Sequence, residues 1–155
     1  VGGMAAAMIA GLARYFDYFP KIIIVEPENA ACVYQSIKTG KIEKISIKKE
    51  SIMGGMSCDE VSLVPWEILK HSVNYCVTIS DDYISKTVKY LFNSKLSEEK
   101  IIGGECSAPG IISLITMYND TKIKDIIGLN EDSNLLLFGC EGDADEELYQ
   151  KLLNN

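Results

Sequence analysis

Four consecutive apolar residues, Ile22 to Val25, are the feature that most limits what this chain can fold into. The run is β-branched throughout and is bounded by Pro20 and Pro27, which interrupt regular strand pairing. An apolar run without alternation indicates a strand buried on both faces, which is typical of a parallel sheet with helices on either side. A second run of this kind is predicted over residues 135–138.

Helices are predicted between the strands from apolar positions three or four residues apart and from end signals. We expect them at Met4–Phe16, from Asn29 as N-cap to Gly40 with Val33 and Ile37 inward, from Pro65 through Leu69, from Asp81 and Asp82 through Ile84, Val88 and Leu91, at Ile111–Met117, and from a capping box at Asp143 and Glu146 through Leu152. An edge strand over 44–52 and a strand over 73–79 complete the set. This order predicts an α/β three-layer sandwich with a mainly parallel sheet, which binds ligands outside the carboxyl ends of its strands.

The composition argues against nucleic-acid-binding, membrane-spanning and metal-binding proteins. The chain has 15 basic against 22 acidic residues and a net charge of −7, whereas proteins that bind nucleic acid backbones carry a basic face. No apolar run approaches the ~18 residues of a membrane span. Five cysteines without a CxxC pair and a single histidine, His71, favour a reducing cytoplasm and no metal site. We expect one cytoplasmic domain over residues 1–155, with neither nucleic acid nor membrane as partner.

Three loops at the predicted carboxyl ends of strands are rich in glycine and small polar residues: 1–5, 103–108 and 139–143. Gly2 and Gly3 directly precede a predicted helix, whose free amides and positive dipole end favour an anion such as phosphate. The pair matches neither the dinucleotide pattern GxGxxG nor the P-loop pattern. A tight turn that packs the helix on the sheet explains the same glycines, so both interpretations stay open.

The other two loops carry reactive side chains. Glu105 and Glu141 stand in glycine turns as candidate acid or base groups, and Cys140 is a candidate nucleophile. A nucleophilic cysteine needs a base within hydrogen-bond reach, and His71 lies in a different segment, so a catalytic Cys/His pair is not favoured. The small core residues are expected to include Cys32, Cys58 and Cys76.

Six segments together resemble a known family. They are VGGMAAA (1–7), IIVEP (23–27), SIMGGMSC (51–58), PWEIL (65–69), GGECSA (103–108) and EGDAD (141–145). Their order and spacing are similar to those in the C-terminal half of the diaminopropionate ammonia-lyases, and the resemblance covers essentially the whole chain. The IVEP strand is shared with serine and threonine dehydratases, whereas the combination of the SIMGGMSC and WEIL segments with EGDAD is specific to the lyases.

The resemblance implies a pyridoxal-phosphate enzyme of fold type II, the tryptophan-synthase-β class, with residues 1–155 as the C-terminal part of its large domain. It implies that Gly2, Gly3, Met4 and Ala5 hold the cofactor phosphate. It also implies that Cys140 lies against the pyridine nitrogen and that Glu105 lies near the cofactor ring. The lysine that carries the cofactor in this family belongs to an N-terminal segment that this chain lacks, so no catalytic residue is expected here.

The implied reaction removes ammonia from 2,3-diaminopropionate and gives pyruvate and a second ammonia, and the implied assembly is a homodimer. We expect the 155-residue chain to be inactive alone. We also expect it to associate through apolar surface at Ala5–Leu12 and Ile23–Val25. Two alternatives stay open: a serine or threonine dehydratase-like enzyme of the same class, and a non-catalytic module that binds a small anion.

Overall fold

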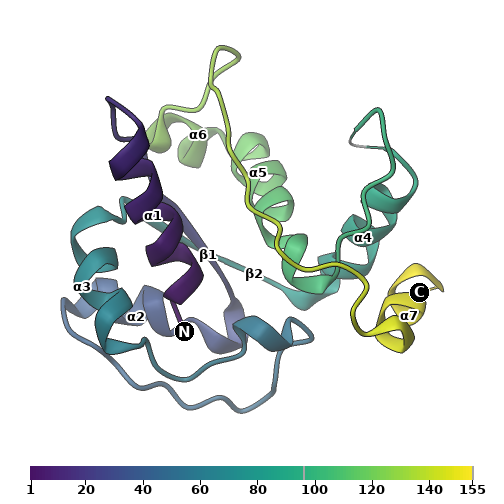
Figure 1. The fold of residues 1–155 in the computed structure, drawn as a ribbon, viewed down its shortest axis with the longest axis horizontal. Helices are drawn as coiled ribbons and strands as arrows, with labels where there is room; N and C mark the ends of the chain where they lie inside the picture. The colour runs from purple at the N-terminus through teal and green to yellow at the C-terminus, as the bar shows by residue number, and fades with distance from the viewer. Residues whose placement is uncertain (96, 155) are drawn as a thin grey trace. The chain divides into compact units, whose positions relative to one another are not determined.

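The computed structural model describes residues 1–95 and 97–154 (Figure 1). It divides into two compact units, Val1–Thr78 and Ile79–Asn155, each with its own packed elements. Among the described residues, no helix has both the length and the apolar character that crossing a membrane requires.

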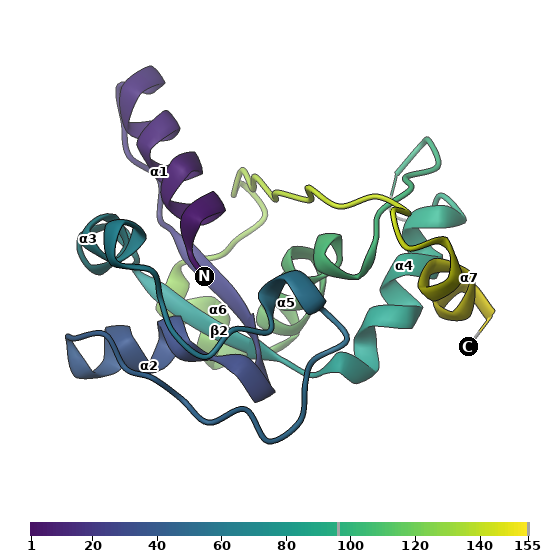
Figure 2. The same cartoon turned by 60° about the horizontal axis from the view of Figure 1, so that its bottom comes forward.

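The first unit combines three helices with a small sheet. Its elements are α1 (Gly3–Tyr15), β1 (Ile23–Pro27), α2 (Cys32–Thr39), α3 (Leu63–Ser72) and β2 (Tyr75–Ile79), whose last residue begins the second unit. β1 and β2 pair directly (Figure 2). The amide of Asn74 donates to the Ile22 carbonyl at 2.9 Å, and the amide of Ile22 donates to Asn74 Oδ1 at 2.7 Å. Each of these residues directly precedes its strand, so both strands start at the same edge, and the predicted α/β class with a parallel sheet is confirmed.

The core of the first unit forms where α1 packs on α3. Its buried members come from α1, α2, α3 and the loop before α3: Ile9, Cys32, Val33, Val61, Trp66 and Leu69. Ala6 and Ile9 are the buried residues of α1, three positions apart on one face, as the helical period requires. Leu69 is fully buried, which stabilises the fold by about 1.5–3 kcal/mol relative to an exposed leucine.

The start of α2 differs from its prediction. Ala31 occupies the N-cap, and Asn29 lies in a short 3₁₀ helix before it. The free amides are satisfied instead by the buried carboxylate of Glu26, which accepts hydrogen bonds from Val33 N at 2.8 Å and Tyr34 N at 2.7 Å. A carboxylate at a helix N-terminus is also favoured by the dipole. The predicted end is confirmed, because Gly40 adopts the left-handed conformation with φ 75°.

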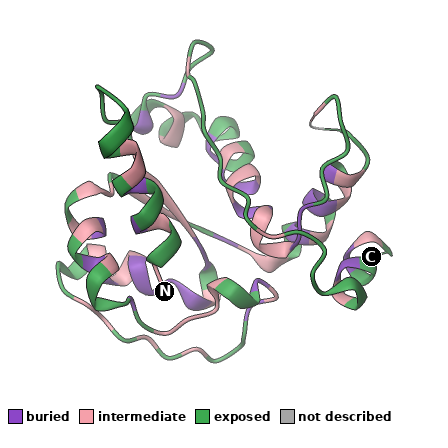
Figure 3. Ribbon diagram, viewed as in Figure 1, coloured by how far each residue is buried: buried purple, intermediate pink, exposed green. Residues whose placement is uncertain are grey.

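The second unit is helical. It contains α4 (Ile84–Phe92), α5 (Pro109–Asn119), α6 (Thr121–Ile127) and α7 (Glu146–Asn154), with α4 packed on α7 and α5 on α6. The predicted inward stripe of α4 is confirmed, since Ile84, Val88 and Leu91 are all buried. Figure 3 shows buried segments along this helix. Ser85 Oγ donates to the Leu152 carbonyl at 2.6 Å and so joins α4 to α7.

Two predicted strands are wrong in the structure. Residues 44–52 form an extended loop, in which Ile45 N donates to the Asp59 carbonyl at 2.9 Å. Residues 135–138 are extended without a ladder partner among the described residues, and their side chains are 43–64% exposed (Figure 3). A strand requires a neighbour that shares its ladder, and an apolar pattern alone does not supply one.

Several helix starts are also shifted. Asp81 and Asp82 form a separate 3₁₀ helix before α4, because Ser80 Oγ accepts from Asp82 N at 3.3 Å. α7 begins two residues later than a cap at Asp143 would place it, since Leu148 N donates to Asp145 Oδ1 at 2.9 Å. Two other helices start two residues early: α3 at Leu63, before Pro65, and α5 at Pro109, before Ile111.

Candidate functional site

The turn before α1 depends on Gly2. Its φ of 102° lies in the left-handed region, where a side chain is strained. A Cβ atom placed on Gly2 would lie 3.0 Å from Leu69 Cδ1 and 3.2 Å from Pro65 Cβ. Gly2 therefore allows α1 to begin in close contact with α3. The glycine serves a tight turn as predicted, but the helix that follows packs mainly on α3, whereas the prediction packed it on the sheet.

The amides that follow Gly2 are available to a ligand. The first helical hydrogen bond of α1 runs from Ala6 N to the Gly2 carbonyl at 2.9 Å, so the amides of Gly3, Met4 and Ala5 precede the helical ladder. Gly2 provides no side-chain cap, and the first turn carries no acidic residue. A Cβ atom on Gly3 would meet nothing within 4 Å, so space is open in front of the turn. Three free amides at the positive end of a 13-residue helix fit the phosphate of the predicted cofactor.

The second group of predicted residues lies in the other unit, where the loops 103–107 and 139–142 meet. Gly104 N donates to the Glu141 carbonyl at 3.0 Å, and Cys106 N donates to Glu141 Oε2 at 2.7 Å. Ser107 Oγ donates to the Glu141 carbonyl at 2.6 Å and accepts from Glu141 N at 3.0 Å. Glu141 is thus bound to the 103–107 loop through its amide, its carbonyl and its carboxylate.

The structure places the predicted Glu105 and Cys140 at this loop pair and Gly2 to Ala5 in the first unit. Cys140 is exposed and stands directly before the anchored Glu141. Glu105 is half-buried, and its pKa is raised above 4.5 by desolvation first and then by the charges of Glu141 and Asp145. Glu105 therefore holds a proton at higher pH than an ordinary glutamate.

Sequence reasoning did not bring Glu105, Cys106 and Glu141 together, and their ligating atoms lie within 4.8 Å of one another. Such a group resembles a metal site in its donors. One Glu141 oxygen already accepts from the backbone, and the raised pKa of Glu105 weakens its anionic form. Two signals were present in the sequence: each loop pairs glycine with a glutamate, and both loops were predicted at the carboxyl ends of strands.

Cys32 is buried as predicted, whereas Cys76 is only half-buried, and both thiols are poor nucleophiles. Burial, followed by the charge of Glu26, raises the pKa of Cys32 to about 12 and that of Cys76 to about 11. Such thiols stay protonated at neutral pH. Cys58 is half-buried.

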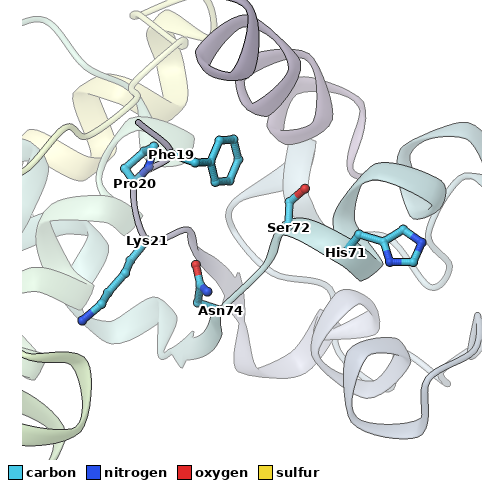
Figure 4. Close-up of a pocket in the computed structure, with 6 residues that line it drawn as sticks. All are labelled: Phe19, Pro20, Lys21, His71, Ser72 and Asn74. Carbon is cyan, nitrogen blue, oxygen red and sulfur yellow. The ribbon is translucent and has the colours of Figure 1, made fainter. Parts of the chain in front are cut away.

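A cavity of about 400 Å³ lies in the first unit, away from the predicted phosphate turn in the sequence (Figure 4). Its lining residues are Phe19, Pro20, Lys21, His71, Ser72 and Asn74. These residues precede β1 and β2, so the cavity opens at the amino ends of the strands, whereas α/β sheets bind ligands at the carboxyl ends. Figure 4 shows the Lys21 and His71 side chains pointing away from each other. The cavity therefore presents no converging charged groups.

Comparisons with known proteins agree with this geometry. The family model described as "Pyridoxal-phosphate dependent enzyme" matches residues 1–126. Diaminopropionate ammonia-lyase of Escherichia coli is 29% identical over 159 aligned residues, which include 99% of this chain and 39% of that protein. Its crystal structure in complex with D-serine matches with a TM-score of 0.85 and 28% identity, over 99% of this chain and 39% of that chain.

A second similar protein is named as a dehydratase. The probable D-serine dehydratase of Fusobacterium nucleatum is 31% identical over 139 residues, covering 84% of this chain and 31% of that protein. This chain thus spans about two fifths of the length of the Escherichia coli enzyme and about a third of the Fusobacterium one.

Proposed function

This chain belongs to the pyridoxal-phosphate-dependent enzymes, and from that premise we propose that it is part of a diaminopropionate ammonia-lyase. The observation that carries the proposal is the open, uncapped start of α1 behind Gly2, which suits a phosphate group. The similarity to the Escherichia coli lyase supports the substrate, since it extends over 99% of this chain.

In this proposal the turn before α1 binds the phosphate group of the cofactor. The amides of Gly3, Met4 and Ala5 donate hydrogen bonds to phosphate oxygens, and the dipole of α1 favours the negative charge. Gly2 keeps α1 against α3 so that these amides stay in place. The side chains of the turn are not needed for this contact.

The loop pair 103–107 and 139–142 carries the other residues that we assign to the cofactor. We assign Cys140 Sγ to the pyridine nitrogen, where a thiol is a weaker hydrogen-bonding partner than a hydroxyl. Glu105 lies beside the ring in this assignment, and its raised pKa favours a carboxyl group that can donate a hydrogen bond. The bound cofactor supplies the electron sink for the removal of ammonia.

The proposed reaction releases ammonia from 2,3-diaminopropionate and gives pyruvate and a second ammonia. We assign no catalytic residue to this chain, and we propose that residues 1–155 are the C-terminal part of the large domain. The proposal extends to a cytoplasmic homodimer that binds a small amino acid and neither nucleic acid nor membrane.

A substrate assay on the full-length gene product tests the function. The protein is saturated with pyridoxal phosphate, and pyruvate release is measured from 2,3-diaminopropionate and from serine. The proposal expects 2,3-diaminopropionate to be turned over much faster. Serine as the faster substrate would instead support a dehydratase, the second candidate, which the 31% identity to the probable D-serine dehydratase favours. Phosphate binding without turnover of either substrate would support the non-catalytic anion-binding module.

A charged side chain at the start of α1 tests separately whether this turn binds the cofactor phosphate. Gly3→Asp places a carboxylate at the N-terminus of α1, where it favours the helix but repels a phosphate. We expect the affinity for pyridoxal phosphate to fall at least about tenfold without loss of stability. Ala10→Asp, at an exposed position of the same helix, is the matched control and should bind normally. Equal affinities of the two variants would refute the assignment of the turn.

A further inference from the structure

We propose that Glu141 and Ser107 are positioning residues that hold the Cys140 thiol in place for the cofactor ring; this inference rests on the proposed function. The two residues stand in different loops, and Cys140 directly precedes one of them. Nothing in the chemistry of glutamate or serine alone points to this role. It follows from how the loops 103–107 and 139–142 are joined.

The hydrogen bonds converge on the residue next to Cys140. The Glu141 carbonyl accepts from both Gly104 N at 3.0 Å and Ser107 Oγ at 2.6 Å, while Glu141 N donates to the same hydroxyl at 3.0 Å. The Glu141 carboxylate accepts from Cys106 N at 2.7 Å. The backbone of Glu141 is thereby fixed on both sides of its Cα atom, which restricts the peptide that links it to Cys140.

Close packing holds the residues on either side as well. A Cβ atom on Gly139 would lie 3.1 Å from Ser107 Cβ, so this glycine sits directly against the serine. A Cβ atom on Gly104 would lie 2.3 Å from the Gly142 carbonyl oxygen, which only a glycine permits. The 139–142 turn is therefore anchored to the 103–107 loop before and after Cys140, whose own side chain is exposed.

The proposed role of Glu141 depends on its side-chain oxygen as a hydrogen-bond acceptor and does not require a negative charge. Its carboxylate serves as an acceptor for one backbone amide, and a glutamine side-chain oxygen can accept the same bond. An alanine cannot, and it leaves the Cys106 amide without this partner. Glu141→Gln should therefore preserve the position of Cys140, whereas Glu141→Ala and Ser107→Ala should release it.

The test measures how strongly the cofactor shields Cys140. The full-length gene product is treated with iodoacetamide with and without saturating pyridoxal phosphate, and the labelling rate of the peptide that contains Cys140 is followed by mass spectrometry. In the wild type we expect bound cofactor to slow the labelling of Cys140 by about tenfold or more. Glu141→Ala and Ser107→Ala should lose most of this protection and shift the absorption maximum of the bound cofactor. Glu141→Gln should retain both, as should the control Glu131→Ala, which changes an exposed glutamate outside the loop pair.

The outcomes separate this inference from the proposed function. Wild-type protection that survives in Glu141→Ala and Ser107→Ala overturns the positioning role while the proposed function stands. A wild type that binds the cofactor and releases pyruvate but leaves Cys140 unprotected overturns it too. A wild type that binds no cofactor overturns the proposed function and this inference together. If Glu141→Ala fails to fold, Ser107→Ala decides, because it removes only the hydroxyl that Glu141 contacts.

Discussion

Replacement of Gly2 by alanine should destabilise the first unit more than any comparable change in the same turn. The φ of 102° costs a side chain about 1–2 kcal/mol. The new methyl group would lie 3.0 Å from Leu69 Cδ1 and 3.2 Å from Pro65 Cβ, and overpacking of this kind costs about 1–3 kcal/mol. Because Leu69 is fully buried, it has little room to move. We expect a total loss of about 2–5 kcal/mol.

Gly3→Ala is the matched control for this prediction. A Cβ atom on Gly3 meets nothing within 4 Å and its φ is not positive, so the change in stability should stay within about 0.5 kcal/mol. Urea unfolding of both variants, followed by far-UV circular dichroism, measures the difference in the free energy of unfolding. Equal stabilities would refute the argument that close contact between α1 and α3 requires a glycine at position 2.

Three further predictions concern the core, its pH dependence and association. Leu69→Ala should lower the free energy of unfolding by about 2–5 kcal/mol, whereas Leu63→Ala, 76% exposed on the same helix, should change it by less than about 0.5 kcal/mol; similar values in urea titrations would contradict the assigned core. Burial raises the pKa of Glu26 above 4.5, so the stability it contributes is present below pH 4.5 and is lost as pH rises through its folded pKa. Glu26→Gln should flatten this decline in urea midpoints across pH 4–7 relative to the exposed control Glu28→Gln, and parallel curves would contradict it. The 155-residue chain should associate at micromolar concentration in sedimentation experiments, and Leu136→Lys, at a 64% exposed position, should reduce that association; a wild-type monomer without concentration dependence would contradict the prediction.

The elements that sequence reasoning placed correctly carry their signals within a few residues. Gly2 stands before a run of helix formers, Gly40 ends α2 in a left-handed conformation, and the stripe of α4 repeats at helical spacing. α6 has equally local signals that would have found it. Asp120 accepts from the amides of Lys122 and Ile123 as its N-cap, and Gly128 follows as its C-cap.

The interactions that sequence reasoning missed join residues that no local sequence pattern pairs. Cys106 and Glu141 are 35 positions apart, and only the folded loops bring the amide to the carboxylate. Glu26 caps α2 from seven residues upstream, at the end of β1, although Asn29 is the better N-cap by residue type. Glu141 was predicted as a candidate acid or base, and no role was predicted for Glu26; the structure uses both carboxylates to satisfy backbone amides.

The two wrong strands follow from a further limit of pattern reasoning. An apolar run indicates that burial of the segment is favourable. The ladder partner that makes the segment a strand lies elsewhere in the sequence or in another chain. Residues 135–138 meet the first condition and not the second, since β1 and β2 form the sheet of the described residues and the run stays 43–64% exposed. Leu137 shows partial compensation, because a Cβ atom on Gly110 would lie 3.5 Å from the Leu137 side chain, in ordinary contact distance of α5. The pattern at 135–138 is thus evidence for apolar surface that needs a cover, and the effect of Leu136→Lys on association measures whether a second copy of this chain provides it.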